Sequence, residues 1–166
     1  MLHEMTISAL TIDAKSQTPI VVLKPKAESD DELLIWIGVL EATSIVYALK
    51  NMKFERPLTH DLFKNYIEQN NSQVTKVEVY DLRDNTFFAK IYFTMDGKEF
   101  YMDARPSDAL ALAVRFEAPI YASDEVLKKV KQEPVSGEMA DDSEEGRKWA
   151  EYLASLSNED FGKYKV

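Results

Sequence analysis

Apolar and polar positions along the second half of the chain follow the period of two that β-strands require. The stretch KVEVYDL, residues 76–82, alternates apolar and polar side chains. The stretch TFFAKIYFT, residues 86–94, is rich in residues that favour strands, and Asp96-Gly97 separates it from KEFYMDA, residues 98–104. Because glycine accepts the positive φ that a tight turn demands, an Asp-Gly pair between two such runs predicts a β-hairpin.

The residues after this hairpin predict a buried helix. It begins at Pro106 or Ser107, because proline suits the first helical position and serine can cap it. Apolar residues then leave few solvent-facing positions as far as Phe116. Two more helices are predicted to begin at the caps Thr59 and Ser123, since each is followed by an apolar stripe at helical spacing.

The same pattern occurs earlier in the chain, which indicates an internal repeat. With an offset of 67 residues, positions 7–49 align with positions 74–116 without a gap. Each copy contains three predicted strands followed by two predicted helices. The sequence therefore predicts an α+β domain over residues 1–132, built from a duplicated β3-α2 repeat at about 5–70 and 72–132.

The end of the chain has a different composition. Residues 133–146 mix acidic residues with Pro, Gly and Ser, as a linker does. Residues 147–166 then place four apolar side chains at i, i+3, i+4 and i+7 on a short amphipathic helix. Because so short a helix is marginally stable alone, we expect it to dock on its own domain or on a second subunit, or else on a partner protein.

Composition limits the classes of function. The 166 residues are 45% hydrophobic, enough for one domain with a core, and the absence of cysteine excludes disulfides and thiolate chemistry. No apolar run reaches the ~20 residues of a membrane span, so we expect a cytoplasmic protein without membrane contact. The net charge of −9 divides into −5 from Glu133 onward and −4 before it. This balance argues against tight, non-specific nucleic-acid binding but leaves room for a small basic site.

Charged residues surround the most apolar segment of the chain. Asp103 and Arg105 precede the helix from Pro106, Asp108 lies in its first turn, and Arg115 lies near its end. The helix dipole can explain Asp108 and Arg115. It does not explain Asp103 and Arg105, which should gather near Asp108 and which are costly beside a buried helix unless they are paired or bind something.

The repeat adds a second carboxylate at a helix start. Glu41 aligns with Asp108, so acids from both copies could converge if the copies pack together. Gly38 aligns with Arg105 and could leave room for a ligand, or could simply allow a tight exit from a strand.

The stretch ERPLTHDLF, residues 55–63, holds one of the two histidines. His60 can act as an acid or base near neutral pH while Asp61 orients it, with Arg56 nearby. A purely structural interpretation is also open, in which Thr59 caps the helix, Asp61 complements its dipole and His60 lies at the surface. An inventory of carboxylates, arginine and histidine suits metal-assisted phosphodiester cleavage, and it equally suits a regulatory module that binds an anion.

Three stretches in this order and spacing resemble the bifunctional nuclease family, namely IWIGVLEATSIVYAL, RPLTHDLF and DARPSDALALAVRFEAPIY. The resemblance covers roughly residues 5–130. It implies that the two copies form one barrel-like mixed sheet with flanking helices, and it implies activity on both DNA and RNA.

These observations together predict a nuclease, and the candidate residues fall into three groups. The catalytic candidates are His60, Asp61, Asp103, Arg105 and Asp108. The phosphate-binding candidates are Arg56, Arg105 and Arg115. The candidate ligands of Mg²⁺ or Mn²⁺ are Glu41, Asp103 and Asp108. We expect weakly bound nucleic acid as the substrate and a homodimer or higher homo-oligomer. The alternative is a non-enzymatic regulatory module that binds a small anionic ligand or a protein partner.

Overall fold

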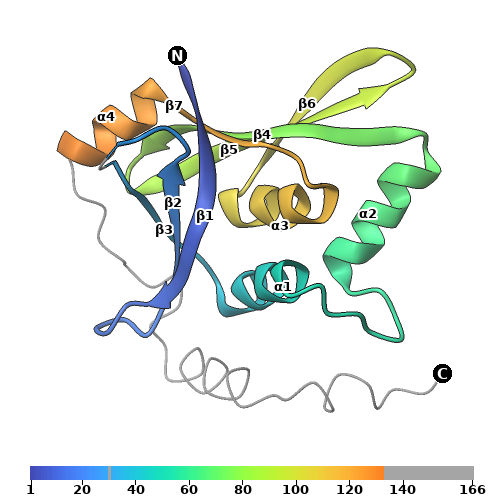
Figure 1. The fold of residues 1–166 in the computed structure, drawn as a ribbon, viewed down its shortest axis with the longest axis horizontal. Helices are drawn as coiled ribbons and strands as arrows, with labels where there is room; N and C mark the ends of the chain where they lie inside the picture. Colours follow the sequence, from blue (N-terminus) through green and yellow to red (C-terminus); the bar gives the residue numbers. More distant parts are fainter. Residues whose placement is uncertain (30, 133–166) are drawn as a thin grey trace.

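The computed structural model describes residues 1–29 and 31–132 as one α+β domain (Figure 1). Its strands are β1 (Leu2–Ile12), β2 (Pro19–Pro25), β3 (Leu33–Trp36), β4 (Ser72–Arg83), β5 (Thr86–Met95), β6 (Lys98–Ala104) and β7 (Ile120–Ser123). Its helices are α1 (Val39–Leu49), α2 (Thr59–Gln69), α3 (Pro106–Phe116) and α4 (Asp124–Gln132). The predicted linker at 133–146 and the predicted helix at 147–166 lie outside the described residues.

The strands form one mixed sheet in the order β3-β2-β1-β7-β4-β5-β6. β7 runs parallel to β4, and the other neighbouring pairs are antiparallel. Because β3 and β6 lie at opposite edges and do not pair, the sheet is open, and the predicted barrel-like closure is wrong. The reason is topological, since β7 enters the middle of the sheet and leaves the third strand of each half at an outer edge.

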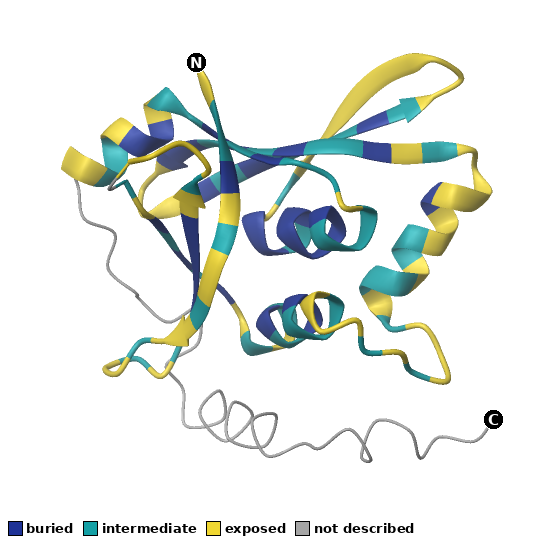
Figure 2. Ribbon diagram, in the orientation of Figure 1, coloured by how far each residue is buried: buried dark blue, intermediate teal, exposed yellow. Residues whose placement is uncertain are grey.

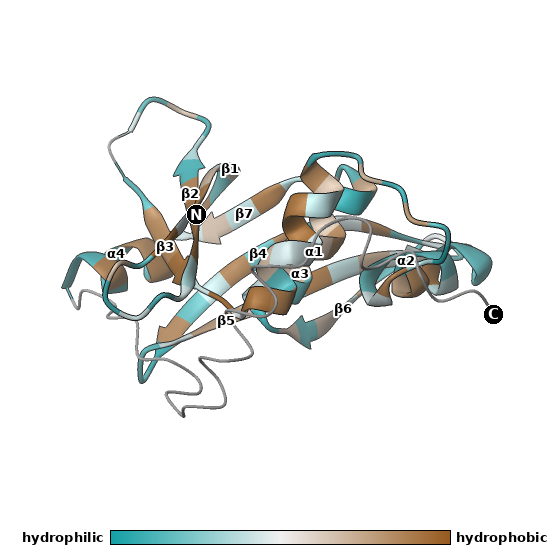
Figure 3. Cartoon of the chain, turned by 90° about the horizontal axis from the view of Figure 1, so that it is seen from below, coloured by the Kyte–Doolittle hydropathy of each residue, from teal (hydrophilic) through white to brown (hydrophobic). Residues whose placement is uncertain are grey.

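α3 lies on β4 and β5, and α1 packs against α3, so the core forms on one side of this part of the sheet (Figures 1 and 2). Leu110 and Leu112 of α3 are 0% exposed, which confirms the predicted buried helix. Burial of each such side chain contributes about 1.5–3 kcal/mol. Apolar residues alternate with polar ones along the longer strands, as Figure 3 shows for β4 and β5. Among the described residues, no helix is long and apolar enough to cross a membrane.

The order of elements agrees with the repeat at most positions. α1 and α3 begin and end 67 residues apart, which is the offset seen in the sequence. β7 is a strand of the second half that has no counterpart between α1 and α2. The duplication itself remains an interpretation of these offsets.

The turn between β5 and β6 confirms the predicted hairpin. Asp96 and Gly97 have φ values of 51° and 74°, both in the left-handed region. The register runs from Met95 opposite Lys98 to Ala89 opposite Ala104. Because this pair of positive φ values matches the twist of the strands, the turn directs β6 back along β5.

Asp81 attaches α4 to the sheet. Its side chain is 9% exposed, and the carboxylate accepts hydrogen bonds from Lys129 Nζ at 2.6 Å, from Arg83 and from the Leu82 main chain. The hydrogen bond from Lys129 outweighs the effect of burial and, with Arg83 and Leu82, lowers the pKa of Asp81 to about 2. The charge on Asp81 therefore stabilises the folded state.

This pairing predicts a loss of stability in acid. The carboxyl has a pKa of about 2 when folded and about 3.9 when unfolded, so its contribution is present above pH ~4 and is lost as the pH falls toward ~2. We expect Asp81→Asn to melt below the wild type at neutral pH, with the gap in Tm narrowing by about 2–4 °C in acid. Thermal denaturation across this pH range measures the gap, with Asp96→Asn in the exposed turn as the control. A gap that does not change with pH would contradict the assignment.

Candidate active site

Three helices bring distant segments of the sequence around one histidine. His60 is the second residue of α2, and its ring lies between α1 and α3. Nδ1 of His60 is 2.7 Å from the hydroxyl oxygen of Ser44 in α1. Nε2 of His60 is 2.9 Å from Oδ1 of Asp108 in α3. A residue from each helix therefore belongs to one hydrogen-bonded chain.

The direction of each hydrogen bond in this series follows from the residues at its two ends, Arg115 and Asp108. Arg115 can only donate, and its Nη2 lies 3.0 Å from Ser44 Oγ. An ionised Asp108 can only accept, so Nε2 of His60 carries the hydrogen. Nδ1 of a neutral ring then accepts the hydroxyl hydrogen of Ser44. His60 is thus held in one tautomer, with both ring nitrogens engaged.

The start of α2 sets the direction of these side chains. Thr59 is already helical and Leu58 is the cap residue, so the predicted Thr59 cap is wrong. Oδ2 of Asp61 instead accepts a hydrogen bond from the Leu58 main chain at 3.1 Å. Ser123 does cap α4 as predicted, because its hydroxyl accepts from the Val126 main chain at 3.2 Å.

Arg115 is enclosed between the helices and is not placed to bind a phosphate, contrary to prediction. Its side chain is 6% exposed, and its Nε donates to Oδ1 of Asp61 at 2.7 Å. Its remaining donors bind Ser44 Oγ and the carbonyl oxygen of Ala111. Asp61 therefore pairs with Arg115 and, among the described residues, makes no hydrogen bond to His60. The adjacency of His60 and Asp61 in the sequence does not bring their side chains together, because neighbours on a helix point about 100° apart.

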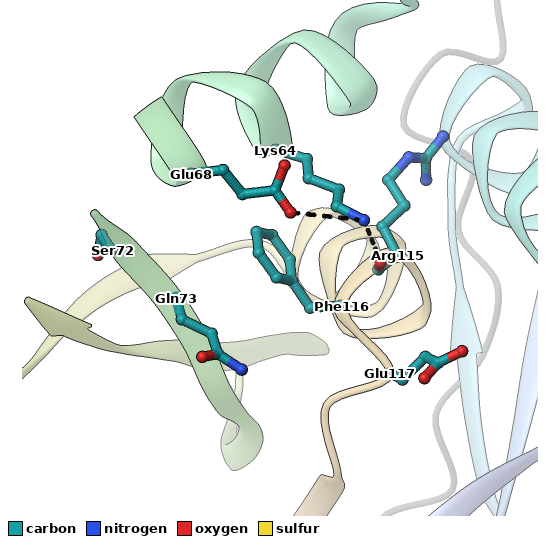
Figure 4. A pocket seen from close by; sticks show the side chains of 7 residues that line it. All are labelled: Lys64, Glu68, Ser72, Gln73, Arg115, Phe116 and Glu117. Atoms are coloured by element: carbon teal, nitrogen blue, oxygen red, sulfur yellow. Dashed lines mark hydrogen bonds and ion pairs between the residues drawn. The ribbon is translucent and has the colours of Figure 1, made fainter. Parts of the chain in front are cut away.

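A polar pocket of about 400 Å³ lies beside the main chain of Arg115 (Figure 4). Lys64 of α2 donates to the carbonyl oxygen of Arg115 at 2.9 Å and lies 5.3 Å from the centre of the Phe116 ring. Its Nζ is also 3.7 Å from Glu68. These contacts tie α2 to the carboxyl end of α3, where a cation is favourable, so we assign Lys64 to support of the helix pair.

Arg105 joins the two acidic helix starts, as the repeat suggested. Its Nε is 2.7 Å from Oδ2 of Asp108, and its Nη2 is 2.9 Å from Oε1 of Glu41. Arg105 nevertheless remains 65% exposed, while Glu41 is 17% exposed. A Cβ added at Gly38 would lie 2.2 Å from Glu41, so the space that glycine leaves is taken by this carboxylate.

Asp108 is ionised at neutral pH because of its partners. Burial alone would raise the pKa of its carboxyl group, but hydrogen bonds from Arg105 and His60 outweigh burial and hold the pKa below the usual value. A persistent carboxylate beside Nε2 orients the imidazole.

A hollow of about 330 Å³ opens beside His60 and Asp108. Thr59, Asp103 and Ala104 also line it, and its remaining lining is apolar, formed by Phe63, Ile91, Phe93, Met102 and Leu112. Ser44 is absent from this lining, so the Nε2 side of His60 is the side that faces the hollow. Three predicted residues, His60, Asp103 and Asp108, thus border one space.

Asp103 borders this hollow from the edge strand and does not join the cluster around Arg105. It pairs in register with Lys90 of β5, so both side chains lie on the face of the sheet opposite α3. The side chain of Asp103 makes no hydrogen bond or ion pair with another residue in the described ranges. Asp103 and Asp108 therefore border the same hollow from different elements, and the catalytic role of Asp103 stays a prediction.

The same placement bears on the metal prediction. Within residues 1–29 and 31–132, no three His, Asp or Glu side chains lie close enough to hold a metal ion together. Glu41 and Asp108 each form an ion pair with Arg105, which lies between them. The predicted trio with Asp103 is therefore not assembled in this arrangement.

Arg56 lies in the loop before α2 and is exposed. Its guanidinium binds no other described residue, so it is available to a ligand near the start of α2. This position leaves the prediction that it binds phosphate open.

Ser44 is the residue that sequence reasoning missed. It is 9% exposed and bonds both His60 and Arg115. The repeat contains a signal for it, because the aligned residue of α3 is Ala111. A polar residue at a position that is apolar in the other copy indicates a buried polar partner, which here is the histidine.

Comparisons with known proteins bear on what this arrangement does. A family model of the bifunctional nuclease domain matches residues 21–134. The chain is 31% identical over 165 residues to an uncharacterized protein of Mycobacterium tuberculosis, covering 96% of this chain and 98% of that protein. It is 28% identical over 127 residues to bifunctional nuclease 1 of Oryza sativa subsp. indica, covering 70% of this chain and 38% of that protein. It is 32% identical over 100 residues to bifunctional nuclease 2 of Arabidopsis thaliana, covering 57% and 30%. The alignments thus span less than half of each of these plant relatives.

Proposed function

The chain belongs to the bifunctional nuclease domain family, and from this membership and the geometry around His60 we propose that it hydrolyses phosphodiester bonds of DNA and RNA. The observation that supports this most is the meeting of His60 and Asp108 at one hollow, with Arg105 bonded to Asp108. A histidine can transfer a proton, a carboxylate can orient it, and an exposed arginine can bind the phosphate.

Arg105 is the residue proposed to bind the phosphate. Its Nε and Nη2 hold Asp108 and Glu41, while its Nη1 binds no described residue. The guanidinium is therefore positioned by two carboxylates and still presents donors to solvent. A phosphate oxygen accepting from Arg105 would lie next to Asp108 and thus close to His60.

His60 is the residue proposed to transfer the proton, through Nε2. This nitrogen lies on the side of Asp108 and the hollow, whereas Nδ1 faces the buried Ser44. In the structure Nε2 donates a hydrogen bond to Asp108. An oxygen of the substrate must therefore replace Asp108 as the acceptor of that hydrogen bond. For this transfer the ring starts as the imidazolium, in which Nδ1 donates to Ser44 Oγ and which Asp108 stabilises. Nε2 gives its proton to the leaving oxygen of the phosphodiester, and the neutral ring keeps its hydrogen on Nδ1. Ser44 and Arg115 keep the ring from rotating.

A divalent cation is part of the proposal, with Glu41 and Asp108 as its protein ligands. Both carboxylates contact one guanidinium, so they form a site for positive charge. A metal ion could bind both only after Arg105 turns toward the phosphate, and it would stabilise negative charge on the phosphoryl oxygens.

The test is an assay of purified protein on single-stranded DNA and RNA with Mg²⁺, with Mn²⁺ or with EDTA. We expect cleavage of both polymers and its loss in EDTA. Arg105→Ala should lower kcat/KM by about 10- to 100-fold, because it removes a charged hydrogen bond to the phosphate. The exposed Lys53→Ala serves as the control. Cleavage that is unchanged in Arg105→Ala would remove the proposed phosphate site.

The alternative is a non-enzymatic module that binds a small anion or a protein, and one observation favours it. Most charges around His60 already neutralise one another, notably Arg115 with Asp61 and Arg105 with Asp108. The absence of cleavage under every metal condition, with the fold intact, would support this alternative. The predicted homo-oligomer remains a prediction, which sedimentation of the purified chain measures.

A further inference from the structure

The face of β4, β5 and β6 that points away from α3 carries an unbroken row of aromatic rings and cations. Its rings are Tyr80, Phe88, Tyr92 and Tyr101. Its cations are Lys76, Arg83 and Lys90. We call these seven side chains the cation–ring row.

Each member of the row contacts the next. Arg83 lies 4.9 Å from the centre of the Phe88 ring, and that ring is 6.3 Å from the Tyr80 ring. Lys90 lies over two rings, at 4.3 Å from Tyr80 and 4.7 Å from Tyr101. The Tyr101 ring is 5.7 Å from the Tyr92 ring, and Lys76 lies 4.2 Å over Tyr92. The contacts therefore run across three strands without a gap.

Strand alternation explains why these side chains share one face. Val77 and Ile91 are paired in register and are buried under α3, so their neighbours in sequence point the other way. Tyr92 is likewise paired with Lys76 on one side and with Tyr101 on the other. The row is thus set by register and not by rotamer choice alone.

The row is open to solvent at its edges. Tyr101 on the edge strand β6 is 58% exposed, and Arg83 at the other end is 59% exposed. Figure 2 shows the exposed end of the β5–β6 hairpin standing clear of the helices. Tyr101 is exposed, and the rings of Tyr80, Phe88 and Tyr92 are half-buried. Rings that reach solvent together on a sheet, in contact with cations, need an explanation that core packing does not supply.

We propose that the cation–ring row binds single-stranded nucleic acid, an inference that rests on the proposed function and specifies the form of its substrate. Unpaired bases stack on aromatic side chains, and lysine or arginine between the rings can contact the phosphates. Bases paired inside a duplex cannot reach these rings. A protein partner would not require each pair of rings to be flanked by cations in this way, so nucleic acid fits the row better.

The row leads to the proposed active site around the edge of β6. Tyr101 lies on the outer face of β6, whereas Met102 and Ala104 line the hollow on the inner face. Arg105 follows directly after this strand. Because β6 is an edge strand among the described elements, a nucleic-acid chain can pass from the row to Arg105 without crossing a paired strand.

Acidic groups on the same face limit the strength of binding. Glu78, Glu99 and Asp103 lie among the cations, and Tyr92 donates a hydrogen bond to Glu78 at 2.8 Å. The whole chain carries a net charge of −9. We therefore expect weak binding that depends on the rings and that decreases as salt is raised.

The experiment measures binding separately from cleavage. Fluorescence anisotropy of labelled oligothymidylate and oligouridylate is followed in EDTA with the full chain carrying His60→Ala, so that the probe stays intact. Tyr101→Ala is added to test the row, and Tyr66→Ala on α2, a tyrosine of similar exposure at 63%, is the matched control. Lys90→Gln is compared with Lys53→Gln, an exposed lysine outside the row.

We expect Tyr101→Ala to weaken binding of single strands by about 5- to 100-fold and to leave duplex binding unchanged. Lys90→Gln should weaken binding and lower the slope of log K against log salt by about one. Neither control should change the affinity.

Equal affinity for duplex and single strands, or full binding in Tyr101→Ala, would overturn the proposal. The proposal would also be overturned if no oligonucleotide bound and the protein were a dimer that Tyr101→Ala dissociates. That result would identify the face as a protein interface. Binding without cleavage by the wild type would leave the row standing and remove the nuclease proposal.

Discussion

Replacing His60 with alanine is expected to lower kcat for phosphodiester cleavage by about 10²- to 10⁴-fold, the range typical of a general acid or base. The physical reason is that His60 is the only imidazole at the hollow and that Asp108 holds its Nε2 on that side. KM should change little, because Arg105, the residue proposed to bind the phosphate, is unchanged. Steady-state kinetics on a single-stranded substrate measure both constants.

The other histidine supplies a matched control for this prediction. His3 lies in β1 and forms a hydrogen bond with Asp124 of α4, away from the hollow. His3→Ala should therefore retain the wild-type kcat. His60→Gln keeps a hydrogen-bonding side chain but cannot exchange a proton near neutral pH, so it should be as slow as His60→Ala. A kcat that recovers in His60→Gln would show that the ring only holds the helices together.

Removing Arg115 is expected to have the largest effect on stability. Its side chain is 6% exposed and binds Asp61, Ser44 and the carbonyl oxygen of Ala111, so Arg115→Ala removes one hydrogen-bond donor from each of three polar groups. Loss of one member of a buried ion pair costs about 3–5 kcal/mol, and the 37% exposure of Asp61 reduces this to about 2–4 kcal/mol. Thermal denaturation should show a Tm lower by about 5–15 °C.

The Tm of Arg115→Ala is to be compared with the Tm of Arg105→Ala. Arg105 also pairs with carboxylates, but it is 65% exposed, so its loss should cost no more than about 1 kcal/mol. The two arginines flank the same helix and should separate into one that stabilises the fold and one that acts on the substrate. If Arg115→Ala melts like the wild type, the network around Ser44 is not structural.

Local patterns predicted much of the fold from the sequence. The alternation in KVEVYDL and the Asp96-Gly97 turn placed β4, β5 and β6, and the proline and apolar residues after Arg105 placed α3. β7 was missed because four residues between two helical segments hold too short a pattern to stand out. Its position in the middle of the sheet is also what keeps the sheet open. Closure was expected from a resemblance and not from any pattern in the residues.

The candidate site was predicted less evenly. His60, Arg105 and Asp108 were identified from their types and from their positions at helix starts. Asp103 borders the same hollow, but the sequence did not show that its side chain lies apart from the cluster around Arg105, because that depends on its register with β5. Ser44 was missed because a serine inside an apolar helix has many ordinary explanations.

The amino-acid sequence determined by itself most of the segments that become strands and helices, β7 excepted, and the turn between β5 and β6. These properties depend on residues within one or two turns of each other, so local periodicity specifies them. Only the tertiary structure decided which charges neutralise one another and which remain open to solvent. Arg115 meets Asp61 from 54 positions away, and His60 meets Asp108 from 48 positions away. Such pairs form only when each helix packs with a particular face toward its neighbours. A helix turned about its axis by one residue would expose an arginine that is now enclosed.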